Sequence, residues 1–298
     1  MRKITLFAKD GYRLSLRDYE ISEPKAVVQI AHGMEEHQLR YKEIAEYLNS
    51  CGFAVVTADM RGHGADAPVL GHFADKDGWK LLVSDMIGIR KYISKVYPDK
   101  PVYLLAHSMG TIISRVMLQK HSHSYEKVVL TGYPNAPAAL PVALALSESL
   151  RTVCGPTFRS AVLREMTTGV FNKAIKNPRT GSDWLSNVPE NVDRFLADPL
   201  CGQGFTAAAY GDLYALVEKM SHPERYTDVN ADMRILMLRG TDDPATGGNK
   251  GAEDSRRVLR EAGFGMLAYI DYEGMRHELL SEKDSGRVRR DISDFFLS

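Results

Sequence analysis

Six short apolar runs rich in Val, Ile, Leu and Tyr recur along the chain, and longer segments of helical period separate them. The runs are AVVQIAH (26–32), FAVVTADM (53–60), PVYLLAH (101–107), KVVLTGY (127–133), RILMLRG (234–240) and MLAYID (266–271). Apolar runs of this length are typical of parallel strands buried on both faces, with helices supplied by the segments between them. The pattern therefore predicts an α/β fold with a mostly parallel central sheet.

The remaining segments extend this core. Residues 4–21, ITLFAKDGYRLSLRDYEI, alternate around the turn dipeptide Asp10-Gly11 and predict a hairpin at an antiparallel edge of the sheet. Apolar side chains at steps of three and four between Trp79 and Val96 predict one long amphipathic helix. A second such pattern, from Val288 to Phe296, predicts a C-terminal helix.

The alternation of strand and helix stops between Tyr133 and about Met233, where prolines and helix-like pieces such as SAVLREMTTGVFNKAI occur without a convincing buried strand. We expect this region to be an insertion that covers the carboxyl edge of the sheet. The predicted organisation is a core formed by residues 1–133 and 233–298, with a helical cap insertion at residues 134–232.

Composition excludes several classes of protein. The 298 residues include 38 Lys plus Arg and 38 Asp plus Glu, so there is no basic field for nucleic acid. The three cysteines lie far apart and lack CxxC spacing, and His32 and His37 have no third ligand nearby, so we expect no metal site. No motif indicates a cofactor. Without a signal peptide or about eighteen consecutive apolar residues, a soluble cytoplasmic protein is expected, with its oligomeric state open.

The stretch AHSMG (106–110) joins the run PVYLLAH to a helix-like segment. The nucleophile elbow of serine hydrolases has the pattern GxSxG, in which a sharp strand-to-helix turn lifts the serine hydroxyl above the sheet. Ala106 replaces the first glycine here. Since that residue ends a strand with negative φ, alanine is permitted, and Ser108 is the candidate nucleophile.

Other strand ends supply partners for Ser108, because ligands of open α/β sheets bind at the carboxyl ends of the strands. His277 follows the last run and would act as general base, while Asp243 follows RILMLRG and would orient its imidazole. The order Ser, Asp, His is the one that α/β-hydrolases use. The backbone N–H groups of Met34, after the turn His32-Gly33, and of Met109 are the candidate oxyanion donors.

Four segments, HGMEEHQLRY, DMRGHGAD, AHSMG and YEGMRHELLSE, carry a family resemblance over nearly the whole chain. They resemble the oxyanion segment, the loop after the next strand, the elbow and the histidine loop of the α/β-hydrolase superfamily. Within it, the chain is similar to monoacylglycerol lipases, bacterial lysophospholipases and related serine esterases of the serine aminopeptidase S33 type. The resemblance implies an α/β-hydrolase fold with an inserted cap and cofactor-free hydrolysis of monoacyl lipid esters through an acyl-enzyme.

The resemblance also refines the site. The family's acid stands three residues after the glycine that closes its strand, which here is Asp243 after Gly240, with Asp242 as the fallback facing solvent. From the residues themselves, His32 is expected to brace the oxyanion turn, Glu36 and His37 to form hydrogen bonds within their loop, and Asp59, Arg61 and His63 to form a buried polar brace. Met34, Met109 and Met166 either line an acyl tunnel or fill the core.

Three other functions remain open at this stage. A short-chain carboxylesterase or an aminopeptidase or amidase shares the fold, and a peptidase would need cap carboxylates to hold a substrate ammonium. The available cap carboxylates are Glu148, Glu165, Asp183, Glu190 and Asp193. A non-catalytic ligand-binding protein is the alternative of another class, although such a protein would be expected to lack a triad residue. The expected partners are a small lipid or ester substrate and, transiently, a membrane surface touched by the cap.

Overall fold

The apolar runs pair into a single sheet. A computed structural model describes residues 1–298, and its eight strands have the order β1-β2-β4-β3-β5-β6-β7-β8. The strands are β1 (Arg2–Phe7), β2 (Arg13–Tyr19), β3 (Ala26–Ala31), β4 (Phe53–Ala58), β5 (Val102–His107), β6 (Lys127–Thr131), β7 (Arg234–Gly240) and β8 (Met266–Tyr272). Strands β3 to β8 run parallel, and β1 and β2 form the predicted antiparallel edge. The mostly parallel α/β fold is confirmed.

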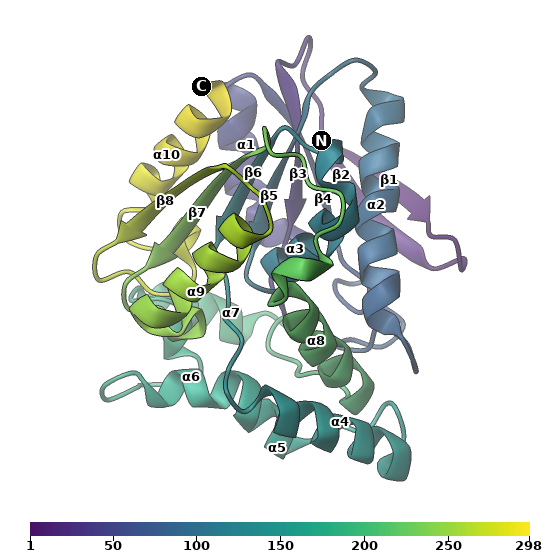
Figure 1. Ribbon diagram of the computed structural model, residues 1–298, viewed down its shortest axis with the longest axis vertical. Coiled ribbons are helices and arrows are strands. Elements are labelled where there is room, and N and C mark those ends of the chain that lie inside the picture. The colour runs from purple at the N-terminus through teal and green to yellow at the C-terminus, as the bar shows by residue number, and fades with distance from the viewer.

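Different helices cover the two faces of the sheet (Figure 1). One face carries α1 (Lys42–Ser50) and α10 (Ser285–Leu297), and the other carries α2 (Gly78–Val96), α3 (Met109–His121), α8 (Ala207–Met220) and α9 (Gly248–Glu261). Neighbouring side chains of one strand serve opposite faces: Val27 packs in the cluster with α2 and α3, and Val28 in the cluster with α1. This explains why β3 to β7 are mostly apolar on both faces and buried along their length, whereas β1 and β2 alternate and the edge strand β8 is largely exposed.

Between β6 and β7 the chain forms helices and no strand, and in Figure 1 most of them lie together beyond one end of the sheet. They are α4 (Leu140–Cys154), α5 (Ala161–Arg164), α6 (Val170–Lys173) and α7 (Pro189–Ala197), with a π-helical turn, Glu165–Gly169, between α5 and α6. In the same segment, α8 is buried and packs against α2 and α3. The boundaries of a cap domain at 134–232 stay a prediction, and we refer below to α4–α7 as the cap helices.

The first turn of α3 lies very close to the end of β3. A Cβ atom added to Gly110 would stand 2.4 Å from the carbonyl oxygen of Ala31 and 2.7 Å from that of His32. Only glycine fits there without moving a strand or a helix backbone. This close approach holds the residue before it, Met109, directly beside the turn that follows β3.

We expect Gly110→Ala to lower the free energy of unfolding by about 1–3 kcal/mol, because the added methyl group meets backbone atoms that cannot move aside. Gly88→Ala is the matched control: it lies inside α2, where an added Cβ meets no atom within 4 Å. That control should raise the free energy of unfolding by about 0.5–1 kcal/mol, because alanine loses less backbone entropy in a helix. Urea unfolding followed by circular dichroism measures both, and equal effects would contradict the close approach.

Candidate active site

Ser108 occupies a strained turn between β5 and α3. Its φ is 49° and its ψ is −120°, a conformation that L-residues rarely adopt. The Ser108 N–H donates to the carbonyl oxygen of Thr131 on β6 at 3.0 Å, and its own carbonyl accepts the Thr111 hydroxyl at 2.7 Å. Ala106 is absent from the residues with positive φ, in agreement with the expectation that alanine is permitted there. The turn therefore presents the hydroxyl at the carboxyl edge of the sheet.

Ser108, His277 and Asp243 lie in one hydrogen-bonded row. His277 Nε2 is 2.8 Å from Ser108 Oγ, and His277 Nδ1 is 2.9 Å from Asp243 Oδ2. All three residues are buried, and Asp243 also accepts the Ala245 N–H at 2.9 Å. Asp242, the fallback acid, is exposed and makes no contact with His277. The structure thus brings together the three residues that the sequence singled out.

The electrostatics of His277 suit a general base. Burial on its own lowers the pKa of His277, but the charge of Asp243 and its hydrogen bond outweigh burial and raise the pKa above its ordinary value of 6.5. A carboxylate in this position favours the protonated ring, which is the form that His277 would have after taking a proton from Ser108. It also holds the proton of the neutral ring on Nδ1, which leaves Nε2 free to accept.

Two unpartnered backbone N–H groups flank Ser108. The N–H groups of Met34 and Met109 donate to no atom of the protein, whereas the Gly33 N–H is taken by Glu36 Oε1 at 2.5 Å. Met109 is the first residue of α3, so its N–H has no acceptor inside the helix. The turn after β3 therefore leaves the Met34 N–H, and not that of Gly33, available for a developing negative charge.

The expected histidine braces are present. His32 Nε2 accepts the Met60 N–H at 2.9 Å, and His63 Nε2 accepts the Glu35 N–H at 3.3 Å. Burial lowers the pKa of both His32 and His63 to about 3, so both rings stay neutral. They link the turn after β3 to the loop after β4 and do not take part in the triad.

Three residues near the triad were not singled out by sequence reasoning as parts of the site. The ring centroids of His107 and Trp184 each lie 4.8 Å from the ring centroid of His277. Burial lowers the pKa of His107 to about 4, so it is a neutral neighbour. A Cβ on Gly132 would lie 3.1 Å from His277 Nδ1. In the sequence, His107 is marked only by its position before Ser108 and Gly132 only by its position after β6, and nothing distinguishes Trp184.

Ser108 opens into two chambers of different chemistry that share Met34 and Trp184. The outer chamber, of about 590 Å³, is lined by charged side chains that include Glu35, Arg164, Glu165 and Lys173. The inner chamber, of about 160 Å³, is mostly apolar. Its lining includes Met34, Met109, Ile112, Leu140, Met166, Phe171, Leu213 and Val217. All three methionines suggested for an acyl tunnel thus line the inner chamber.

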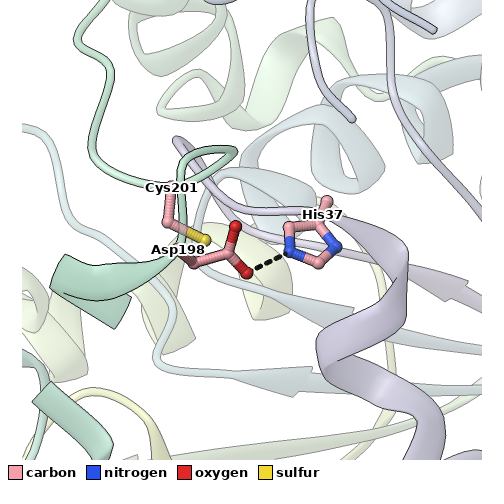
Figure 2. Close-up of side chains that lie close together, drawn as sticks. All are labelled: His37, Asp198 and Cys201. Atoms are coloured by element: carbon pink, nitrogen blue, oxygen red, sulfur yellow. Dashed lines mark hydrogen bonds and ion pairs between the residues drawn. The ribbon is translucent and has the colours of Figure 1, made fainter. Parts of the chain in front are cut away.

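One group of side chains has the composition of a metal site (Figure 2). The ligand atoms of His37, Asp198 and Cys201 all lie within 4.8 Å of one another. However, His37 Nε2 already bonds Asp198 Oδ2 at 2.8 Å, and burial raises the pKa of the Cys201 thiol to about 12. The positive charge of Arg40 lowers the pKa of this thiol but does not offset the effect of burial. These observations favour a hydrogen-bonded link between the turn after β3 and the segment after α7.

Comparison with known proteins is consistent with this geometry. Residues 22–284 match the family described as serine aminopeptidase, S33 (Hydrolase_4). The chain is 30% identical to the mouse monoglyceride lipase over 237 residues, covering 78% of this chain and 71% of the relative. It is 32% identical to a phospholipase of Bacillus subtilis over 287 residues, covering 94% and 99%. A carboxyl esterase structure from Bacillus coagulans matches with a TM-score of 0.92 at 24% identity, covering 99% and 97%.

Because the pKa of His277 is raised, we expect kcat/KM to fall as the pH drops through a midpoint above 6.5, where the base becomes protonated. In Asp243→Asn, burial dominates and the midpoint should move below 6.5, while kcat falls by about 10⁴-fold. Asp242→Asn is the control and should leave both the midpoint and kcat unchanged. A pH–rate profile on a soluble ester measures this, and a midpoint below 6.5 in the unaltered enzyme would count against the assignment.

Proposed function

This chain belongs to the serine aminopeptidase S33 family of α/β-hydrolases and is a serine hydrolase of the lipase and esterase type, and we propose that it cleaves carboxylic esters of monoacyl lipids through an acyl-enzyme. The proposal depends above all on one observation. The hydrogen-bonded row from Ser108 to Asp243 opens into two chambers, one with a mostly apolar lining and one whose lining includes several charged side chains.

In the proposed mechanism, Ser108 Oγ attacks the ester carbonyl carbon while His277 Nε2 takes the hydroxyl proton. The carbonyl oxygen becomes an oxyanion that accepts hydrogen bonds from the N–H groups of Met34 and Met109. When the tetrahedral intermediate collapses, the imidazolium gives its proton to the departing alkoxide, which leaves as an alcohol. Asp243 stays ionised and stabilises the imidazolium during both proton transfers.

Water then completes the cycle. His277 Nε2 removes a proton from a water molecule as its oxygen attacks the acyl carbon bound to Ser108 Oγ. The second tetrahedral intermediate collapses by breaking the bond to Ser108, which recovers its proton from the imidazolium. The free carboxylic acid is released and the enzyme returns to its starting state.

The two chambers support a lipid ester in one orientation. An acyl chain gains free energy when it leaves water, so it belongs in the inner chamber among Met166, Leu213 and Val217. The alcohol part of the substrate, which carries hydroxyl or other polar groups, belongs in the outer chamber with its carboxylates and cations. Monoacylglycerol and lysophospholipid share this division into one acyl chain and one polar head.

The outer surface of the cap helices supports transient contact with a membrane surface. Two large apolar side chains of α4, Val142 and Val153, are 63% and 83% exposed and line neither chamber. Exposed apolar side chains of this kind could enter a lipid surface. No helix has both the length and the apolar character required to cross a membrane.

The cap carboxylates give little support to a peptidase. Glu148 pairs with Arg151 at the surface, Asp193 pairs with Arg179, and Asp183 accepts bonds from its own loop. Of the five cap carboxylates considered for binding an ammonium group, only Glu165 lines the outer chamber, and it pairs with Lys173 at 2.7 Å. An ester with a polar alcohol part therefore fits the chamber better than a free amino terminus.

The test of the function is a hydrolysis panel of glycerol monoesters of increasing acyl length, lysophosphatidylcholine and proline anilide. Each substrate is also run with Ser108→Ala, which should abolish turnover because the nucleophilic oxygen is lost. We expect serine-dependent turnover to peak on the monoacyl lipids. Turnover confined to acetyl and butyryl esters, or to the anilide, would replace the lipid assignment with a small-ester hydrolase or a peptidase.

A second test concerns the inner chamber. Met166→Trp should narrow that chamber and reduce kcat/KM for palmitoyl esters by roughly 10-fold or more, with little effect on acetyl esters. Val162→Trp, on the same run of cap helix but exposed and outside both chambers, is the matched control. Equal losses on both ester lengths, or an equal loss in the control, would show that the acyl chain does not occupy the inner chamber.

A further inference from the structure

Behind Ser108 and His277, three charged side chains form a continuous buried row. Arg40 Nη1 donates to Glu36 Oε2 at 2.8 Å and to Glu278 Oε1 at 2.7 Å, and Arg40 Nη2 donates to Glu278 Oε2 at 2.8 Å. The side chains of Arg40, Glu36 and Glu278 are only 17%, 5% and 8% exposed. Two carboxylates thus share one guanidinium almost out of contact with water.

Each end of this row is joined to a part of the proposed catalytic machinery. Glu36 accepts the Gly33 N–H at 2.5 Å, and Gly33 is followed by Met34, the proposed oxyanion donor. At the other end, Glu278 directly follows His277, the proposed base. The two ends, Glu36 and Glu278, belong to loops after β3 and β8, which are not adjacent in the sheet, and the bond from Arg40 to Glu278 joins residues 238 apart in sequence. The row therefore bridges two loops that no strand pairing aligns.

The charges of the row are retained despite the cost of burying them. Burial acts to raise the pKa of Glu36, but the charge of Arg40, a nearby histidine and the hydrogen bonds from Tyr41 and Gly33 together hold the pKa below its ordinary value, so the carboxylate is ionised at neutral pH. Buried ion pairs contribute little net stability compared with apolar packing, whereas removing one partner is strongly destabilising. Besides electrostatic attraction, a bidentate pair between an arginine and a carboxylate fixes the relative orientation of the two side chains.

The cap helices also rest on this row. Asn191 Nδ2 of α7 donates to Glu278 Oε2 at 2.7 Å, and the Glu278 N–H donates to the carbonyl oxygen of Leu185 at 2.8 Å. The Arg40 guanidinium lies 5.2 Å from the ring centre of Phe195, also on α7. The carboxylate beside the base is thus held from the oxyanion turn on one side and from the cap on the other.

We propose that Glu36, Arg40 and Glu278 are positioning residues that set the separation between the Met34 N–H and His277 Nε2. Through its bond to Glu278, Asn191 makes this separation depend on whether the cap helices are packed against the row. The inference rests on the proposed function in one respect, namely that the Met34 N–H and His277 act on the same tetrahedral intermediate. None of the three residues exchanges a proton with substrate. Their effect is on the geometry of the transition state, where a displacement of about 1 Å costs on the order of 100-fold in rate.

The experiment separates transition-state binding from ground-state binding. Glu278→Gln keeps the size of the side chain but replaces one carboxylate oxygen that Arg40 needs for the bidentate pair. We expect roughly a 100-fold fall in kcat on p-nitrophenyl butyrate, with KM changed less than threefold. The affinity for butyl boronic acid, which forms a tetrahedral adduct with Ser108, should fall in parallel with kcat. The affinity for a non-hydrolysable butyl ether should not change.

Arg61→Lys is the matched control. Arg61 is another buried arginine that bonds two carboxylates, Asp85 and Asp10, but it lies in the polar brace after β4. Its substitution should lower the unfolding temperature and leave kcat and the boronic acid affinity unchanged. Asn191→Ala, which removes only the link from the cap, should lower kcat by less than Glu278→Gln does.

Two outcomes would overturn the proposal. One is a Glu278→Gln enzyme with wild-type kcat and boronic acid affinity, and the other is an equal loss of boronic acid and ether affinity, which indicates general damage. If Glu278→Gln does not fold, Arg40→Lys carries the same readouts, because it keeps the charge and loses the bidentate geometry. Because p-nitrophenyl butyrate is a short activated ester, these measurements do not require the enzyme to act on lipids. The comparison therefore holds even if the proposed lipid substrate is wrong. Loss of turnover in Ser108→Ala tests the serine mechanism separately.

Discussion

The strained turn at Ser108 is the constraint on which the rest of the site depends. A φ of 49° is unfavourable for serine, and it persists because the residue is held from three sides. β5 before it is paired on both edges, its N–H is bonded to Thr131 on β6, and α3 after it is pressed onto the end of β3 at Gly110. The hydroxyl is lifted clear of the sheet at the one position where His277 Nε2 reaches it.

The second determinant is the contact between the cap helices and the carboxyl edge of the sheet. The ring of Trp184 lies against that of His277, and the Asn191 side chain donates a hydrogen bond to Glu278, the residue after His277. The segment between β6 and β7 therefore forms part of the wall around Ser108, His277 and Asp243. Residues of the same segment, Trp184 among them, line both chambers beside Ser108. Ser108, His277 and Asp243 thus lie at the strand ends, while much of the wall around them comes from the segment between β6 and β7.

Much of the fold could be predicted because its signals are local. The apolar runs that became β3 to β8 are each continuous in sequence, and their ends were placed within one or two residues. The triad was accessible for a related reason: Ser108, Asp243 and His277 each follow a strand, and parallel strands bring their carboxyl ends to one edge. His107 and Trp184 could not be assigned in this way, because a histidine at the end of a strand and a tryptophan in a short 3-10 helix have no distinguishing pattern until the packing places them beside His277.

The sequence by itself determined the α/β class, the parallel core and which residues stand at the strand ends, because apolar periodicity and backbone requirements such as the glycine at 110 act over a few residues. Only the tertiary structure decided which N–H of the turn after β3 is free, how the space above Ser108 is divided, and that Glu36 and Glu278 share Arg40. Those features depend on contacts between side chains up to 238 residues apart. Burial and distance, which set the strength of every charge and hydrogen bond involved, exist only once the chain is folded.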